Sequence, residues 1–587
     1  MDKLLVDSRL MRQRVGYWLK RVGLFPTAQL VWRWIRLISN PDLIRRERAI
    51  GEEYRRFAEQ YGAALRWKLQ PGGRSHKKAL VVSVGFPSGV QAELGLIKAL
   101  EAAGFDIVAV MKRDPWLVKY YRLAGVSQIV FWDQFACPLA ASTIDAAFDA
   151  LRTSDDLLAF EYAGTRTGRC VASTALRNLR VGSLDLQAPS TRRALRPYFA
   201  AGMRQALAAR ELIREIQPTT AMFVDRGYTP QGELFDVCLS EGIDTFTWNA
   251  AHKGNLLMLK RYAQHNRDDH PVSLSSESWA RVCAMPWTDA HRRRLREELQ
   301  GAYASGEWYS EVGTQFKAKS LEAEAVKIRL RLDQDKKTAV IFPHILWDGT
   351  FFWGSDLFRS YEEWFVETVR NAAANTAINW VIKVHPANMV KDARDGVKGE
   401  PSELTAIRKH IGPLPPHMVV IPADSDINTF SLFSVMDYCL TVRGTVGIEA
   451  ACMGIPVLTA GTGRYDHKGF TIDSESRGEY LERLANLQAI PALRPAQREL
   501  AERFAYAIFV MRTLPLSSFT LEYRKDSLAS IQTRINAVSK EDWLEALDLK
   551  AFVEWLAHPD QLDFFSIPPP VAPAYAETAD ACAMHVR

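Results

Sequence analysis

The sequence predicts an α/β protein with two Rossmann-like domains that face each other across a cleft, with helical extensions at both ends. The chain has 587 residues, which is more than one ordinary hydrophobic core accommodates. Apolar runs of strand length alternate with helical periodicity in two separate stretches, a pattern typical of parallel sheets covered by helices. A charged stretch with few strand signals separates them. We therefore place the first domain at 76–286, a helical linker at 287–336 and the second domain at 337–490.

The segments outside these domains differ from them in composition. Residues 1–75 are predicted to form a basic, aromatic, helical extension, in which Trp32 and Trp34 are interleaved with arginines. Such an extension either lies in a membrane interface or packs its tryptophans on the body of the protein. Periodicity predicts helices over 491–567, and the stretch 568–587, rich in proline and alanine, is predicted to be disordered.

Composition narrows the class of protein. The formal net charge of +6 is small for this length, and no arginine stripe is interleaved with aromatic residues in the two domains, so no nucleic-acid partner is predicted. The seven cysteines form no CxxC pair, as expected in a reducing compartment. No apolar run of the sequence reaches the roughly 18–20 residues that cross a bilayer. We therefore expect a cytoplasmic protein. If the amino-terminal extension lies in a membrane interface, the protein also contacts the inner membrane peripherally.

The first domain opens with the apolar run 79–84, which fits a buried parallel strand and is followed by a helical pattern to Leu100. The loop after this strand lacks the GxGxxG spacing, so a dinucleotide cofactor is not predicted there. Further strands are predicted at 105–110, 128–131, 220–224 and 244–248, with mostly helical sequence over 140–210.

The second domain starts with a strand at 338–342. The loop that follows is rich in tryptophan and phenylalanine and also carries His344 and Asp348. Aromatic rings beside a few polar groups suit a nucleobase or a sugar ring. We therefore expect His344 and Asp348 to line a ligand site.

A second motif follows the apolar run 378–384, which predicts a buried strand ending at Lys383, His385 and Pro386. Ligands of open α/β sheets bind at this carboxyl edge. His385 is suited to donate a hydrogen bond to a phosphate oxygen, and Pro386 fixes the local backbone. Lys383 either adds positive charge to the site or points to solvent.

A third motif contains Arg443, Gly444, Thr445, Gly447 and Glu449 between a strand and a helix. Unpaired N–H groups at the start of a helix favour an anion, and the glycines allow close approach of the backbone. The threonine adds a hydroxyl donor, and the glutamate is placed to accept hydrogen bonds from a ribose or sugar hydroxyl. An ordinary strand-to-helix turn with a solvated glutamate is the alternative.

A glycine-rich loop at 461–470 follows the next strand and carries Arg464. Because this loop lies at the same predicted edge, Arg464 is a candidate to bind a phosphate or a sugar-acid carboxylate. A surface loop without a ligand is the alternative.

Together, the runs 342–349, 383–386 and 443–450 resemble segments of GT-B glycosyltransferases that build bacterial surface polysaccharides, including capsule Kdo transferases and sialyltransferases with a His-Pro motif. The resemblance covers mainly 337–484. In such families the motif histidine and the hydroxyl residue of the later loop hold the phosphate of the donor, which implies that role for His385 and Thr445. The acidic-Gly motif that holds the base in sialyltransferases lies in the first domain, so this role is not transferred to Asp348.

The resemblance implies a glycosyltransferase that moves a sugar from a nucleotide sugar, such as a CMP-linked sugar acid like CMP-Kdo, to a glycan or lipid-linked glycan of capsule or lipopolysaccharide. No carboxylate pair at metal-ligand spacing is evident, so neither a metal nor another cofactor is expected, and the phosphate-binding residues would stabilise the leaving group. UDP and GDP sugars stay open. So do a sugar-nucleotide epimerase, a CDP-glycerol-type phosphotransferase, and a nonenzymatic component of capsule assembly or export.

Inverting transfer needs a base to take the proton of the acceptor hydroxyl. Asp225, directly after the strand 220–224, is the leading candidate, and Glu233 and His252 are weaker ones. If the strands 220–224 and 244–248 are parallel, their carboxyl ends, and Asp225 with them, point into the same cleft. Capping of a turn or helix start is the alternative role for this aspartate.

Overall fold

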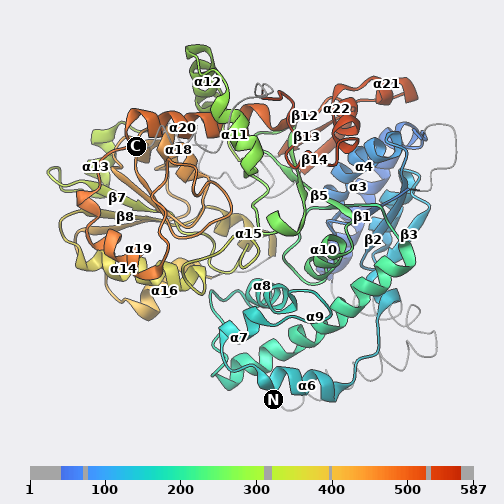
Figure 1. The fold of residues 1–587 in the computed structure, drawn as a ribbon, viewed down its shortest axis with the longest axis horizontal. Helices are drawn as coiled ribbons and strands as arrows, with labels where there is room; N and C mark the ends of the chain where they lie inside the picture. Colours follow the sequence, from blue (N-terminus) through green and yellow to red (C-terminus); the bar gives the residue numbers. More distant parts are fainter. Residues whose placement is uncertain (1–40, 71–76, 310–319, 396–398, 524–530, 570–587) are drawn as a thin grey trace.

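The computed structural model describes residues 41–70, 77–309, 320–395, 399–523 and 531–569. Two sheets, each covered by helices, lie side by side, with the first domain on the right and the second on the left of Figure 1. This confirms the predicted fold class of two Rossmann-like α/β domains. The tryptophans of the amino-terminal extension and nearly all of the predicted disordered tail lie outside the described residues.

The first domain contains a sheet of seven strands in the order β12-β6-β5-β4-β1-β2-β3. The strands from β5 to β3 are parallel, whereas β6 is antiparallel to β5 and β12 is antiparallel to β6. Their bounds are β1 Lys78–Val82, β2 Asp106–Met111, β3 Gln128–Phe131, β4 Thr220–Phe223, β5 Asp244–Ala250, β6 Leu256–Tyr262 and β12 Thr513–Pro515.

Both faces of this sheet are covered, which explains why β1 and β2 are apolar without interruption after their first residues. Val81 and Ala109 face a core shared with the helices on one side, and Leu80 and Val108 face a second core on the other side. The helices are α3 Pro41–Leu65, α4 Pro87–Ala102, α5 Pro115–Leu123, η1 Trp132–Phe135, α6 Ala141–Ala150, α7 Ser154–Ala159, α8 Thr167–Leu179, α9 Pro189–Ile216, α10 Gln231–Ser240, η2 Gln264–Asn266 and α11 Ser276–Ala284.

The second domain contains a five-stranded parallel sheet in the order β11-β10-β7-β8-β9. Its strands are β7 Thr338–Ile341, β8 Asn379–Lys383, β9 Met418–Ile421, β10 Tyr438–Thr441 and β11 Val457–Thr459. The strand order reverses between β7 and β10, and open α/β sheets bind ligands at the carboxyl ends beside such a switch point. Its helices are α14 Tyr361–Ala374, α15 Ala387–Asp395, α16 Ser402–His410, α17 Thr429–Phe433, α18 Val446–Cys452, α19 Arg477–Ala485 and η4 Leu487–Ala489.

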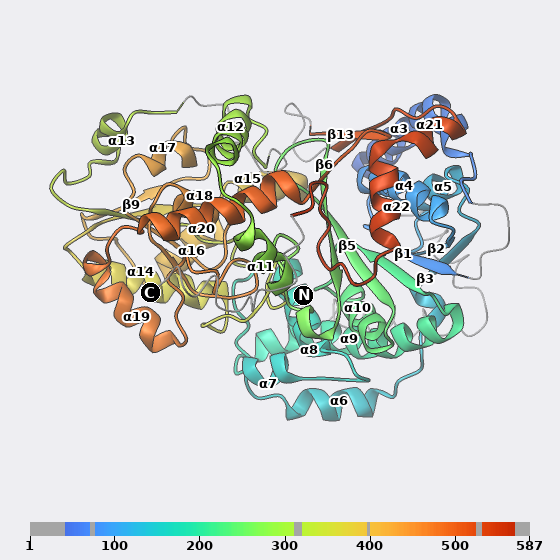
Figure 2. The ribbon, with the colours of Figure 1, turned by 45° about the horizontal axis from the view of Figure 1, so that its top comes forward.

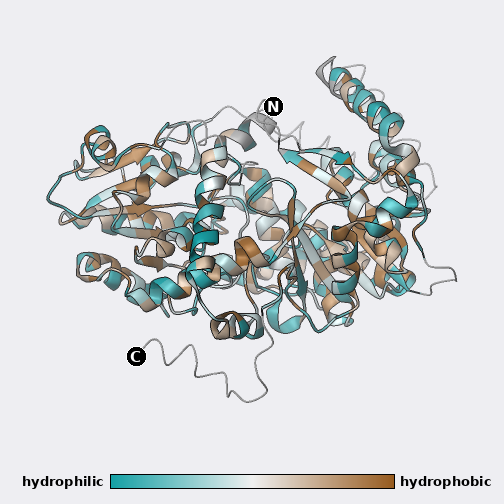
Figure 3. Cartoon of the chain, turned by 90° about the horizontal axis from the view of Figure 1, so that it is seen from above, coloured by the Kyte–Doolittle hydropathy of each residue, from teal (hydrophilic) through white to brown (hydrophobic). Residues whose placement is uncertain are grey.

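The linker contributes α12 Asp289–Ser305 and α13 Ala323–Leu330, which pack against the second domain. Figure 3 shows hydrophilic residues gathered on the outward-facing helices and hydrophobic residues along the interior strands of both domains. In the described part of the chain, no helix combines the length and the apolar character that crossing a membrane requires.

The carboxy-terminal segment crosses from the second domain back to the first (Figure 2). It contains α20 Pro495–Tyr506, a π-helix at Ala507–Met511, β12, the hairpin β13 Phe519–Tyr523 and β14 Ile531–Ile535, and then α21 Lys540–Glu545 and α22 Leu547–Leu556. The prediction of helices alone over 491–567 is therefore wrong in part. β12 is only three residues long and becomes a strand because β6 offers it a free sheet edge, which periodicity does not detect.

A fully buried ion cluster fastens this segment to the first sheet. Asp563 accepts hydrogen bonds from the Lys260 ammonium at 2.8 Å and from the backbone N–H of Ser275 at 2.8 Å, and the Arg512 guanidinium lies 3.3 Å from the same carboxylate. Burial alone would raise the pKa of Asp563, but Arg512 and Lys260 outweigh it and hold the pKa well below its usual range.

Replacing Asp563 by asparagine is expected to lower the free energy of unfolding by about 3–5 kcal/mol at neutral pH, because Arg512 then stays buried without the charge of Asp563 and Lys260 keeps only Asp269, 3.7 Å away. Urea unfolding followed by tryptophan fluorescence measures the change. Asp106→Asn, at an exposed position of β2, is the control and should change it by less than about 0.5 kcal/mol.

The same experiment has a predicted pH dependence. The folded-state pKa of Asp563 is depressed, so its contribution is present above the unfolded-state pKa of about 4 and is lost as the pH falls toward the folded-state pKa. The difference between Asp563→Asn and the wild type should therefore shrink in acid. A variant as stable as the wild type at pH 7 would show that the cluster does not hold the segment.

Candidate functional site

A cavity of about 210 Å³ opens in the second domain beside the switch point. The loops after β7, β8 and β10 contribute to it because parallel neighbouring strands end at the same edge of the sheet. Tyr303 near the end of α12, and Trp308 and Tyr309 just after it, form another part of its wall. Its lining residues are Tyr303, Trp308, Tyr309, Phe342, Pro343, His344, Lys383, His385, Pro386, Thr429, Thr441, Gly444, Thr445, Val446 and Glu449.

The structure thus brings together most of the residues that the sequence predicted for donor binding. Those that line the cavity are His344, Lys383, His385, Pro386, Gly444, Thr445 and Glu449. Asp348, Arg443, Gly447 and Arg464 do not line it. The linker aromatics were not predicted, although the run 303–309 of an otherwise charged segment contains two tyrosines and a tryptophan.

Lys383 is the last residue of β8 and points into the protein rather than to solvent. Its side chain is buried, and within the described residues its ammonium group has no hydrogen-bond partner. Burial lowers the pKa to about 8, although the carboxylates of Asp424 and Asp426 oppose this shift. Burying an ammonium without a partner is costly, so this side of the cavity is suited to an anion.

His385 follows in the loop after β8, where its ring orientation is fixed. The backbone N–H of Ala387 donates to Nδ1 at 3.2 Å, which places the proton of the neutral ring on Nε2. Burial, helped by the charge of Lys391 and opposed by Asp348, lowers the pKa of His385 to about 4. At neutral pH the ring is therefore an uncharged donor through Nε2, next to the cationic Lys383.

The loop after β10 carries Gly444 and Thr445 to the same cavity. Thr441 holds this loop, because its Oγ1 accepts a hydrogen bond from the backbone N–H of Gly444 at 3.1 Å. The backbone N–H of Thr445 donates to no acceptor within the described part of the chain. Gly447 has a different role from the predicted one, since a Cβ there would collide with the ring of Tyr465. Its small size serves packing inside the domain.

Glu449, one turn into α18, is buried rather than solvated. Its carboxylate accepts hydrogen bonds from the Tyr303 hydroxyl and the Trp308 indole N–H. Burial raises its pKa to about 7 and exceeds the lowering effect of these two donors. The carboxyl group thus forms a polar end to a wall that is otherwise aromatic.

His344 and Arg443 hold the cavity in shape. The backbone N–H of Arg443 donates to His344 Nε2 at 3.3 Å, and the imidazole stacks on Tyr361 with ring centres 4.7 Å apart. The Arg443 guanidinium pairs with Asp356 and donates to the Tyr361 hydroxyl at 3.3 Å. Arg464 in turn donates to the Arg443 carbonyl at 3.2 Å. The Arg443 guanidinium is thus paired with Asp356 and one Arg464 nitrogen with a backbone carbonyl, while the buried Nε of each has no hydrogen-bond partner among the described residues.

Asp348 lies outside the cavity, in a charge cluster between the two domains. It accepts a hydrogen bond from the Tyr228 hydroxyl at 2.8 Å and pairs with Lys391, and Arg177 of α8 lies 3.5 Å away. Burial alone would raise its pKa, but Lys391 and Arg177 outweigh it and lower the pKa to about 2. Asp348 is therefore ionised and links the loop after β7 to the first domain.

Asp225 follows β4. This strand pairs with β5 in parallel, as the proposed role of Asp225 requires. Its side chain is exposed, but the surrounding protein desolvates it and raises its pKa, with Arg177 opposing and Asp348 adding to the rise. Lys391 and Asp348 also act on the pKa of His385. Asp225 therefore lies on the first-domain side of a charge cluster that extends to the cavity.

Asp225 does not line the cavity, and the other two candidate bases lie in the interior of the protein. Glu233 is buried inside the first domain, where it accepts a hydrogen bond from Thr229 at 2.7 Å and burial raises its pKa to about 8. His252 is buried behind the aromatic wall and pairs with Glu298 at 2.6 Å. Neither side chain lines the cavity, and an acceptor hydroxyl would have to enter the protein core to meet them.

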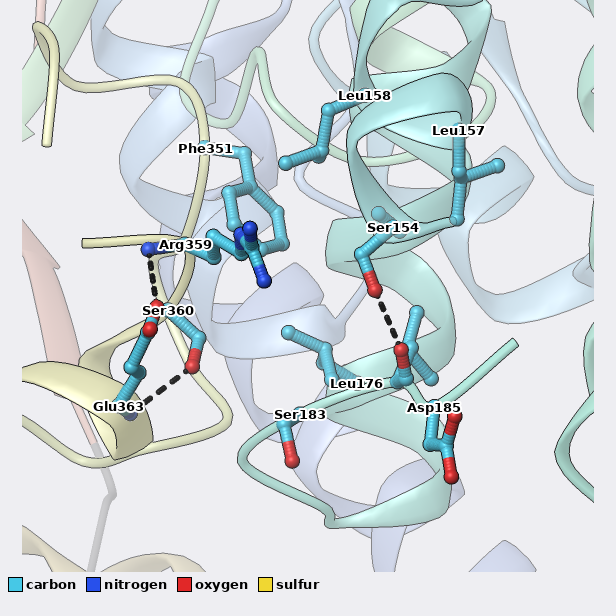
Figure 4. A pocket seen from close by; sticks show the side chains of 12 residues that line it. Ser154, Leu157, Leu158, Leu176, Ser183, Asp185, Phe351, Arg359, Ser360 and Glu363 are labelled. Atoms are coloured by element: carbon cyan, nitrogen blue, oxygen red, sulfur yellow. Dashed lines mark hydrogen bonds between the residues drawn. The ribbon is translucent and has the colours of Figure 1, made fainter. Parts of the chain in front are cut away.

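A second cavity, also about 210 Å³, lies between α7 and α8 of the first domain and the loop before α14 of the second (Figure 4). Leu157, Leu158 and Phe351 give it an apolar lining. Its polar groups already have protein partners: Ser154 donates to the carbonyl of Leu184 at 2.6 Å, and Glu363 accepts from the backbone of Arg359 at 2.8 Å. The first cavity, with its unpartnered lysine, is the better candidate site.

The described ranges, 41–70, 77–309, 320–395, 399–523 and 531–569, offer no cluster of metal-ligating side chains. No group of three or more His, Cys, Asp or Glu side chains in them is placed to hold a metal ion.

Residues 290–489 match the family model described as capsule polysaccharide biosynthesis protein. This part of the chain, about a third of its length, is thus similar to capsule polysaccharide biosynthesis proteins. This confirms the resemblance inferred from the motifs, and the matched residues include the three loops of the cavity and the linker aromatics. No curated protein matches the sequence significantly.

Solved structures offer only distant likenesses. The beta Kdo 2,4 transferase KpsC of Thermosulfurimonas dismutans is 14% identical over 54% of this chain and 85% of its own, with a TM-score of 0.30. The beta Kdo 2,7 transferase KpsC of the same organism is 13% identical over 60% and 89%, also with a TM-score of 0.30. UDP-GlcNAc 2-epimerase from Neisseria meningitidis is 10% identical over 74% and 98%, with a TM-score of 0.25. Neither residues nor substrates are transferred from them.

Lys383→Met is expected to abolish anion binding and to stabilise the ligand-free protein by on the order of 1–3 kcal/mol, the usual cost of an unsatisfied buried polar group. The folded-state pKa of about 8 lies below the ordinary 10.5, so the charged lysine costs stability below pH 8 and this cost fades as the pH rises toward 10.5. Thermal unfolding with and without inorganic phosphate measures both effects.

Lys409→Met, at an exposed position of α16, removes the same charge from the surface and is the control. It should change neither phosphate binding nor stability by more than about 0.5 kcal/mol. A Lys383→Met protein that still binds phosphate, or that is less stable than the wild type, would contradict the role of Lys383 as the anion-binding cation.

Proposed function

We propose that this protein is a glycosyltransferase of bacterial capsule or lipopolysaccharide synthesis, which moves a sugar from a nucleotide sugar to a glycan or lipid-linked glycan. The observation that carries the proposal is that, among the described residues, neither the ammonium of Lys383 nor the backbone N–H of Thr445 has a partner, and that both line one cavity with His385, whose Nε2 is a donor. They meet at the switch point of a segment that matches capsule polysaccharide biosynthesis proteins.

The phosphate of the donor would lie against these three groups. As the bond between the phosphate oxygen and the sugar breaks, negative charge develops on that oxygen, and donors already fixed in place stabilise it without reorganisation. The charged group is Lys383, while His385 contributes an uncharged N–H. We expect that these groups replace a divalent metal and that activity survives chelation. A CMP-linked sugar acid such as CMP-Kdo is the donor that the motif resemblance favours.

The acceptor would approach from the first domain, with Asp225 as the base. Its carboxylate is exposed and its pKa is raised, so it is both reachable and more basic than an ordinary aspartate. In an inverting transfer it would take the proton of the acceptor hydroxyl while that oxygen attacks the anomeric carbon. Peripheral contact with the inner membrane, through the basic aromatic residues of the amino-terminal extension, would bring a lipid-linked acceptor to this side.

The donor site is tested by thermal shift of the purified protein with CMP, CDP, UDP and GDP, because a ligand that binds the folded state raises the melting temperature. One nucleotide should give a selective rise. His385→Ala should weaken its binding by about 1.5–3 kcal/mol, the usual value of a charge-assisted hydrogen bond. No shift with any nucleotide, in a protein shown to be folded, would favour a nonenzymatic capsule component.

The catalytic step is tested by transfer from the nucleotide sugar so identified to a capsule oligosaccharide. Asp225→Asn should lower kcat by about 10²–10⁴-fold, as loss of a general base does, and leave nucleotide affinity unchanged. Asp145→Asn, an exposed aspartate that pairs with Arg196, is the matched control. Product analysis separates the alternatives, since an epimerase leaves the nucleotide sugar intact and a phosphotransferase moves the phosphate with the group.

A further inference from the structure

The aromatic residues that the linker contributes to the cavity form a continuous surface that reaches the phosphate-binding end, where the Tyr309 side chain hydrogen-bonds with that of Thr445. Tyr303 and Trp308 stack with ring centres 5.2 Å apart and an angle of 20° between their planes. Trp308 and Tyr309 meet edge to face at 5.5 Å. All three side chains line the cavity, whereas Lys383 and His385 enter it from the sheet of the second domain.

This surface is rigid before any ligand arrives. Trp308 is held from behind by Phe509 at 4.8 Å and by His252 at 5.3 Å. The backbone N–H of Tyr309 donates to the carbonyl of His252 at 2.7 Å, which secures the positive φ of 45° at Tyr309. A bulky residue adopts such a φ only where the surroundings impose it. The backbone that carries the Tyr309 ring is therefore fixed in the wall of the cavity.

The polar end of the surface is also fixed. The Glu449 carboxyl group, held by Tyr303 and Trp308, lies one helical turn beyond Thr445, the residue at the phosphate-binding end. The cavity therefore presents a cationic end, an acidic hydrogen-bonding group and an aromatic wall. A nucleotide offers a phosphate, ribose hydroxyls and a flat base.

We propose that Tyr303, Trp308 and Tyr309 form the nucleoside-binding wall of this cavity, with Glu449 meeting the ribose and a tyrosine or tryptophan ring stacking on the base. The proposal rests on the function proposed above and specifies which part of the chain binds the nucleoside. Stacking on aromatic side chains binds any base by its flat face, so these residues supply affinity for the nucleoside. A linker between two domains thereby becomes part of the donor site.

The test compares three probes by calorimetry: the nucleoside monophosphate selected in the thermal-shift panel, ribose 5-phosphate and inorganic phosphate. Tyr309→Ala should weaken binding of the nucleotide by about 10-fold to 100-fold, the range found for loss of a stacked base. It should weaken binding of ribose 5-phosphate by much less, through the lost hydrogen bond to Thr445 alone. Tyr309→Phe keeps the ring and should restore most of the nucleotide affinity. Trp67→Ala, at an exposed site of the first domain, is the control.

Glu449→Gln separates the ribose from the base. This substitution should weaken the binding of the nucleotide and of ribose 5-phosphate to the same extent and leave the binding of inorganic phosphate unchanged. Lys383→Met should weaken the binding of all three probes. Equal losses of nucleotide and ribose 5-phosphate in Tyr309→Ala would overturn the nucleoside wall while the phosphate site stands. If the wild-type protein binds no nucleotide at all, the nucleoside wall and the proposed function both fail.

Discussion

The parallel pairing of β7 with β8 on one side and β10 on the other is the constraint on which the candidate site depends. Parallel strands are joined by crossover connections, so neighbouring strands end at the same edge of the sheet. The loops that follow them therefore lie close together. His385 follows His344 by 41 residues and Thr445 follows His385 by 60, yet all three line one cavity. A different strand order would scatter them.

Burial then decides what chemistry these residues offer. Lys383 keeps an ammonium group in the interior without a partner, and the pKa values of the two cavity histidines, His344 and His385, are lowered so that both rings are neutral at pH 7. The site therefore combines one formal positive charge with several fixed uncharged donors. Such an arrangement favours an anion whose charge increases during the reaction, because the donors need not reorient when the charge develops.

Contacts between the domains connect this site to the first domain. Asp348 comes from the second domain but receives Tyr228 and Arg177 from the first, and Asp225 responds to the same charges. The linker aromatics reach the cavity from a third direction, and the carboxy-terminal segment returns to be fastened by the buried Asp563. Pieces of the chain that lie far apart in sequence therefore determine one another's positions.

The sequence by itself determined the fold class, and most of the donor-binding residues that it predicted line the cavity. Apolar runs of strand length, and the glycines and prolines that end them, are local signals in the sequence. Because ligands bind at the carboxyl ends of strands, these signals were enough to predict that Lys383, His385 and Thr445 lie together. Tertiary structure alone decided which polar groups were already paired. Arg443 and Arg464 look like anion ligands in the sequence but bind Asp356 and a backbone carbonyl, and Gly447 is small because Tyr465 packs on it. Tyr303, Trp308 and β12 likewise acquire their roles from partners distant in the chain, and periodicity within one segment carries no information about such partners.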